Sequence, residues 1–257
     1  MRAAIFTAIF AIFAIFANAE GYPKNGPFIV VLDAGHGGKD PGTIGSSQEN
    51  REKDINLAIT LEVGRLLKEN QPDVKVIYTR STDVFVELGE RANIANKAKA
   101  DLFVSIHTNA IERDIQRQPT GVQAYTLSLS TASTNLEVEK RENSVTRFEK
   151  DGERKYNYSG NAESDIIFEL MQDRDMKESV KFAKIAQKYM TNDAGRNNMG
   201  VQQADLCVLR RTYMPSVLLE VGYISTPSEE EFLMSTAGRN KMALSIYKAI
   251  VEYKKQH

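Results

Sequence analysis

Short apolar runs of strand length alternate along the chain with longer stretches of helical periodicity. In one such stretch, residues 51–70, Ile55, Ile59 and Val63 fall on one helical face. Strands that alternate with helices predict an α/β fold in which helices cover both faces of a sheet. The predicted strands are 28–32, 74–78, 102–106, 121–127, 206–210 and 217–221, and the predicted helices are 51–70, 87–100, 178–190 and 240–253.

The alternation stops between about Ser128 and Met176. This segment is rich in charged residues, Ser and Asn, which predicts a long insertion with at most partial helices. Residues 28–257, including the insertion at 128–176, have a length that suits a single domain.

The first residues follow a different pattern. Arg2 precedes an apolar run over residues 3–17, and Ala-Asn-Ala ends at Ala19. This pattern predicts a secretory signal peptide, residues 1–19, cleaved after Ala19 and followed by a short lead, 20–27. We expect the mature chain to be secreted or periplasmic, without a stable membrane span. The alternative is an uncleaved anchor, although the run is short for a spanning helix.

Composition and charge narrow the classes of function. Apolar residues make up 42% of the chain and charged residues 26%, which is enough to build a core and to cover it. The net charge of −1 gives no sign of nucleic-acid binding. The single cysteine, Cys207, excludes an intrachain disulfide and is expected to pack in the core.

Two of the three histidines share one sequence context, directly after an apolar run. His36 follows residues 28–32 in the glycine-rich loop DAGHGGKDPG, and His107 follows residues 102–106 in SIHTNA. Ligands collect at the carboxyl ends of strands in α/β folds, and neutral imidazole is the commonest metal ligand. The alternative for His36 is a turn residue hydrogen-bonded to nearby backbone.

Two glutamates are candidates for the same site. Glu52 follows the glycine loop and could supply the third protein ligand that a catalytic zinc typically needs; its alternative role is at the helix N-terminus. Glu220 stands in the middle of the apolar run SVLLEVGYIS. Burial would raise its pKa and suit it to act as a general base and acid, whereas the alternative is a strand-edge residue that faces water.

Four motifs, DAGHGGKDPG, REKDINL, SIHTNA and LLEVGYIS, occur in this order within residues 28–253. Together they resemble the zinc-dependent N-acetylmuramoyl-L-alanine amidases of the cell-separation type. The resemblance implies a mixed, mostly parallel twisted sheet of about six strands surrounded by helices. It also implies hydrolysis of the amide between N-acetylmuramic acid and L-alanine in peptidoglycan, in wall remodelling or daughter-cell separation.

The resemblance also implies roles for individual residues. One Zn²⁺ ion would be bound by His36, Glu52 and His107, and Glu220 would activate the attacking water and then protonate the leaving amine. Asn109 stands two residues after His107, where some members of the family carry Asp, so we do not count it as a ligand.

The insertion at 128–176 stands in the place where the family resemblance implies a possible regulatory element. Division-type members can carry an inserted helix that covers the zinc until a LytM-domain activator protein removes it. Glu142 in KRENSVTRFE resembles the R-E-N element of that helix, which makes it a possible regulatory residue. The alternative is a solvated loop without a regulatory role.

Two other functions remain open. Another zinc peptidase or amidohydrolase would use the same metal chemistry on a free peptide. A non-catalytic wall-binding module is disfavoured, because inactive relatives should lack a ligand or the base, and all four residues are present here.

Overall fold

The computed structural model describes residues 26–111, 118–128, 135–152 and 162–257, with the backbone alone over 162–174. The predicted signal peptide, 1–19, lies outside the described residues, as do most of the lead and two parts of the insertion. Within the described part of the chain, no helix is long and apolar enough to cross a membrane.

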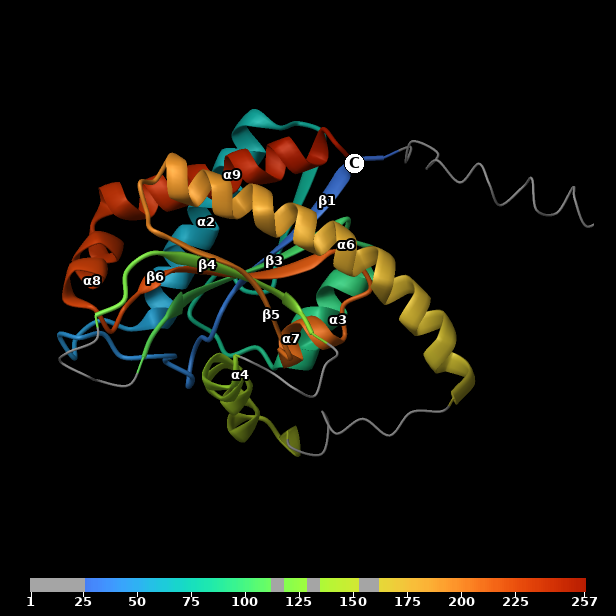
Figure 1. The fold of residues 1–257 in the computed structure, drawn as a ribbon, viewed down its shortest axis with the longest axis horizontal. Coiled ribbons are helices and arrows are strands. Elements are labelled where there is room, and N and C mark those ends of the chain that lie inside the picture. The colour runs from blue at the N-terminus through green and yellow to red at the C-terminus, as the bar shows by residue number, and fades with distance from the viewer. Residues whose placement is uncertain (1–25, 112–117, 129–134, 153–161) are drawn as a thin grey trace, which may run out of the picture.

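Six strands form one mixed sheet in the order β2-β1-β3-β6-β4-β5 (Figure 1). Strands β2, β1, β3 and β6 are parallel, whereas β4 runs antiparallel to β6 and carries β5 parallel to itself. This arrangement confirms the predicted α/β class and the mixed, mostly parallel sheet. The strands are β1 Phe28–Ala34, β2 Val74–Tyr78, β3 Leu102–Asn109, β4 Val122–Leu127, β5 Asn198–Ala204 and β6 Ser216–Tyr223.

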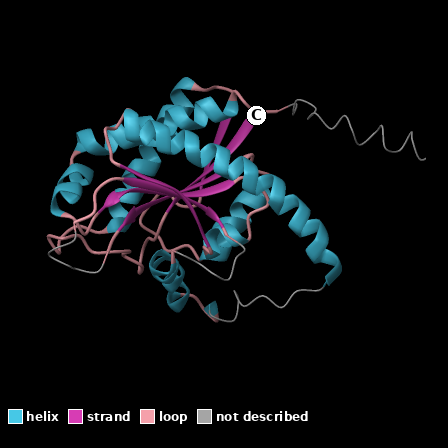
Figure 2. Ribbon diagram, viewed as in Figure 1, coloured by secondary structure: helices cyan, strands magenta, loops and turns pink. Residues whose placement is uncertain are grey.

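Helices cover both faces of the sheet (Figures 1 and 2). Successive side chains of a strand point to opposite faces, so Val30 and Leu32 pack against α2, α6 and α9, whereas Val31 packs on the side of α3 and α7. The helices are α2 Glu52–Asn70, α3 Leu88–Ala98, α4 Leu136–Asn143, the 3-10 helix η1 Ser144–Phe148, α6 Ala162–Asn192, α7 Cys207–Arg210, α8 Pro227–Met234 and α9 Thr236–Lys254.

Residues 206–210, predicted as a strand, do not form one. Residues Cys207–Arg210 form the short helix α7, and the edge strand is β5, Asn198–Ala204. Most side chains of β5 are exposed or half-buried, so its sequence NMGVQQA carries no apolar pattern. The apolar residues next to it are buried in the core, where so short a run fits a helix as well as a strand. Cys207 is buried, as expected.

The predicted insertion contains more helix than its composition indicated. Helix α4 and η1 lie within it, and α6 begins at Ala162 rather than near Glu178. Helix α4 lies beside α7 on the same side of the sheet as α3 (Figure 1). Nζ of Lys39, in the loop after β1, donates to the carbonyl of Phe148 at 2.6 Å, so the inserted segment reaches the edge of the sheet at which the parallel strands end.

Candidate metal centre

The loop after β1 places His36 with its backbone in the left-handed region, at a φ of 61°. The Nδ1 atom of His36 donates to Oδ2 of Asp40 at 2.7 Å, and both side chains are buried. In the neutral imidazole this hydrogen bond keeps the proton on Nδ1, which leaves the lone pair of Nε2 available to bind a metal. Nε2 lies 3.1 Å from Oε1 of Glu52.

Glu52 is the first residue of α2 and is completely buried. Its Oε1 accepts from the backbone N–H of Thr108 at 3.1 Å and from Nδ2 of Asn56 at 3.2 Å, and its Oε2 accepts from the N–H of Thr43 at 2.9 Å. These three donors hold the carboxylate in one orientation. Nδ1 of His107, on β3, lies 3.3 Å from the same Oε1.

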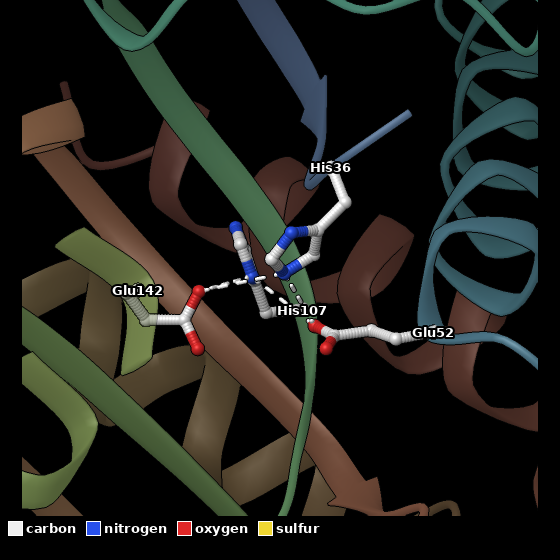
Figure 3. A group of neighbouring side chains, drawn as sticks. All are labelled: His36, Glu52, His107 and Glu142. Carbon is white, nitrogen blue, oxygen red and sulfur yellow. Dashed lines mark ion pairs between the residues drawn. The ribbon is translucent and has the colours of Figure 1, made fainter. Parts of the chain in front are cut away.

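A fourth side chain, Glu142 of α4, completes the cluster (Figure 3). Its Oε2 lies 2.9 Å from Nδ1 of His107 and 3.6 Å from Nε2 of His36. One ligand atom from each of the four buried residues lies within 4.8 Å of all the others. The structure thus brings together the three predicted ligands and adds the residue predicted to be regulatory.

The unpaired atoms of this cluster fit a metal ion. His36 Nε2, His107 Nδ1 and Glu142 Oε2 are buried, and none makes a well-formed hydrogen bond within the described residues. Imidazole nitrogen and carboxylate oxygen are ligands that zinc takes at about 2.0–2.1 Å, which separates neighbouring atoms of a tetrahedron by about 3.3 Å. The separations of 2.9–3.6 Å between the imidazole and carboxylate atoms match that spacing.

The charges of the cluster favour a cation. Burial lowers the pKa of His107, but Glu142 and Glu52 outweigh it and raise that pKa to about 9. Burial also opposes a charge on His36, and Glu52 and Asp40 raise its pKa well above the ordinary value. The two buried carboxylates therefore stabilise positive charge on the imidazoles, and a bound metal ion would supply that charge in place of the imidazole protons.

Glu220 of β6 lies beside His107, since the two residues are paired in register on adjacent parallel strands. Burial raises the pKa of Glu220 to about 8, although Arg141 opposes this shift. Nη2 of Arg141 donates to its Oε1 at 2.8 Å, while Oε2 is buried and has no partner among the described side chains and backbone. The predicted rise in pKa is present, and burial is its main cause.

Several residues of the site were not singled out from the sequence. Asp40 stands four residues after His36, a spacing that could have indicated an orienting partner, and Arg141 is visible directly before Glu142 in the KREN sequence. No sequence pattern indicated a role for Asn56. Asn109 uses its Oδ1 to accept from the N–H of Ala110 at 2.8 Å.

The chain has an α/β fold with a cluster of buried His and Glu side chains that could hold a metal ion. The model of the N-acetylmuramoyl-L-alanine amidase family matches residues 30–252, and the chain belongs to this family. The membership confirms both the family and the enzyme class predicted from the four motifs.

Individual relatives agree with this assignment. The chain is 32% identical over 235 residues to the amidase AmiC of Escherichia coli O6:H1, a match that covers 90% of this chain and 54% of AmiC. The chain thus spans about half of that relative. The catalytic domain of CwlV, an amidase from Paenibacillus polymyxa, superposes with a TM-score of 0.66 at 32% identity, covering 88% of this chain and 98% of that catalytic domain.

A further solved structure contains a second protein. The CwlD amidase of Clostridioides difficile, in complex with the GerS lipoprotein, superposes with a TM-score of 0.66 at 26% identity. The match covers 89% of this chain and 99% of CwlD.

Proposed function

We propose that this protein hydrolyses the amide between N-acetylmuramic acid and L-alanine in peptidoglycan, using one Zn²⁺ ion held by His36, Glu52 and His107. The observation that carries the proposal is the convergence of the buried ligand atoms of His36, Glu52 and His107 beside the buried Glu220. Family membership supports the choice of bond.

Glu220 performs the proton transfers in this mechanism. Bound zinc supplies Lewis acidity, which polarises the scissile carbonyl and acidifies the attacking water. Glu220 accepts a proton from that water at Oε2, its unpaired oxygen, and then delivers a proton to the departing alanine nitrogen. Burial raises the pKa of Glu220, so its carboxylate binds a proton more strongly than an exposed carboxylate would.

We propose further that the structure represents a self-inhibited state. A catalytic zinc keeps one position open, whereas Glu142 brings a fourth potential ligand, the second carboxylate, to the cluster. Arg141 pairs with Glu220 and donates to the carbonyl of Ala110 at 2.7 Å, so α4 occupies the space in front of the base as well. Substrate then gains access only after α4 has moved.

Contacts from α4 to the segment around α7 hold it in this position. Oε1 of Glu139 accepts from the N–H of Asp205, and Oδ1 of Asn143 accepts from the N–H of Cys207, at 2.7 and 2.8 Å. A protein that binds α4 or this segment can compete with these hydrogen bonds. We propose a LytM-domain activator in this role; the CwlD–GerS complex supports the idea that amidases of this fold bind protein partners.

Export follows from the same proposal. Residues 1–19 carry the pattern of a cleaved signal peptide, and peptidoglycan lies outside the cytoplasm. We propose a secreted or periplasmic enzyme that acts in wall remodelling or daughter-cell separation.

Digestion of purified peptidoglycan tests the activity. The chain from Glu20 is incubated with zinc or with a chelator, alone and as a variant in which a short linker replaces residues 129–161, and the products are analysed by mass spectrometry. Zinc-dependent release of intact stem peptides, stronger in the shortened variant, is expected. Cleavage within the stem peptide would indicate a zinc peptidase instead, and no release by a zinc-loaded shortened variant would overturn the proposal.

A further inference from the structure

Two buried arginines, Arg80 and Arg91, lie behind the loop that carries His36. Arg91 comes from α3, and Arg80 follows β2; their exposed fractions are 1% and 3%. Nη1 of Arg91 donates to Oδ1 of Asp33 at 2.7 Å, and Thr79 and Ser105 donate their hydroxyl hydrogens to the same carboxylate. The Asp33 carboxylate is therefore fully paired and fully buried, and it holds the Arg91 guanidinium in place.

The two guanidinium groups bind three consecutive carbonyl groups of the loop. Arg91 donates to Ala34 O at 2.8 Å and to His36 O at 2.9 Å. Arg80 donates to Ala34 O and to Gly35 O, both at 2.8 Å, and to Lys53 O in the first turn of α2. With these carbonyls bound, the peptide planes on both sides of His36 have one orientation.

This orientation matters because His36 has a backbone conformation that residues other than glycine seldom adopt. A change in its φ would swing the imidazole away from Glu52, from which Nε2 is 3.1 Å. The loop also positions the second histidine, since a Cβ on Gly35 would lie only 2.3 Å from Nε2 of His107. A small cavity of about 10 Å³ is lined by Arg91 together with His36 and His107.

We propose that Arg91 and Arg80 are positioning residues of the metal site, which set the His36 backbone and thereby align both imidazoles for the metal. The inference rests on the proposed zinc site. The hydrogen bonds that the two guanidinium groups give to the loop go to its carbonyl groups, and each arginine acts through them. Lysine cannot replace them, because a single ammonium group lacks the planar set of donors with which Arg91 binds Asp33 and two carbonyls and Arg80 binds the carbonyls of Ala34, Gly35 and Lys53.

Zinc affinity of the purified full chain, measured by competition with a chromogenic chelator, tests this role. Arg91→Lys is expected to lose affinity by about 10- to 100-fold, as is typical when groups that orient metal ligands are removed. The thermal midpoint of each metal-free variant is measured in parallel with its zinc affinity. Arg80→Lys provides a second variant should Arg91→Lys fail to fold.

Arg196→Lys is the matched control. Arg196 is another largely buried arginine, paired with the buried carboxylate of Glu229 and stacked on Phe232, and it contacts none of the ligand-bearing loop. The Arg196→Lys substitution should lower the thermal midpoint of the protein without changing its zinc affinity. If the arginine variants at the loop behave in the same way, their role is structural and the inference is wrong. Failure of the unsubstituted chain to bind zinc would overturn the proposed function instead.

Discussion

Nη2 of Arg141 lies 2.8 Å from Oε1 of Glu220, which joins the inserted helix α4 to the residue proposed as the general base. The neighbouring residue, Glu142, lies among the metal ligands. Two adjacent residues of one helix therefore engage both chemical groups that the proposed reaction needs. A carboxylate paired with a guanidinium is a weaker base, and its access to water is reduced as well.

Replacement of Arg141 by Ala should raise peptidoglycan hydrolysis. The variant loses charge-assisted hydrogen bonds to Glu220 and Ala110, each worth about 1.5–3 kcal/mol, so an increase of at least about 10-fold is expected. Release of stem peptides by the full chain measures it. Arg147→Ala is the control, because Arg147 stacks on Phe148 in the same insertion. Equal rates for both variants would show that the pairing with Glu220 does not restrain the enzyme.

Glu220→Gln should abolish turnover while leaving the metal in place. The amide cannot accept the proton of the attacking water, and general acid–base catalysis contributes about 10²- to 10⁴-fold. The comparison is made in the Arg141→Ala background, where the initial rate is higher. Zinc content by elemental analysis should stay at one ion per chain, whereas His36→Ala and His107→Ala should lose it. Substantial activity in Glu220→Gln would remove this residue from its proposed role.

Much of the fold was predictable because the central strands are buried on both faces. Strands β1 and β6 therefore appear as continuous apolar runs, and α2 shows a clear helical period. The edge strand β5 was missed for the opposite reason, since water covers much of it and its side chains are polar. Helix α8 was missed because it is short, although Pro227 at its start is a favourable first residue.

The candidate site was predictable where its residues follow strands. His36 and Glu220 are polar residues in or directly after apolar runs, and a polar residue in such a position can be recognised from the sequence. The positions of Arg141 and Glu142 in the site could not be predicted in the same way, because they depend on how the insertion packs against the rest of the fold. The contacts that decide it run from α4 to Asp205 and Cys207, more than sixty residues further along the chain.

Asp40→Asn should weaken zinc binding without removing a ligand. Asp40 accepts from Nδ1 of His36 and, through Oδ1, from the N–H of Gly42 at 3.1 Å, and an amide can accept only one of these hydrogen bonds through its oxygen. A loss of about 10- to 100-fold in affinity is expected. Chelator competition measures it, with Asp83→Asn as the control, because Asp83 accepts from the nearby Gly38 N–H but contacts no ligand. Unchanged affinity in Asp40→Asn would mean that this carboxylate does not orient His36.

Glu230→Gln should reduce stability near neutral pH and lose that effect in acid. Burial raises the pKa of the Glu230 carboxyl, but hydrogen bonds from Ser46, Ser47 and Asn50 outweigh it, and the net shift is downward. A lowered pKa in the folded state stabilises the protein above the unfolded value of about 4.3, and this stabilisation disappears as the pH falls through the folded pKa. Thermal midpoints at pH 7 and at pH 3 therefore measure the effect: the unsubstituted chain should melt higher than the variant at pH 7, and the gap should narrow at pH 3. The same gap at both values would show that the charge of Glu230 does not anchor the loop over residues 46–50 to α8.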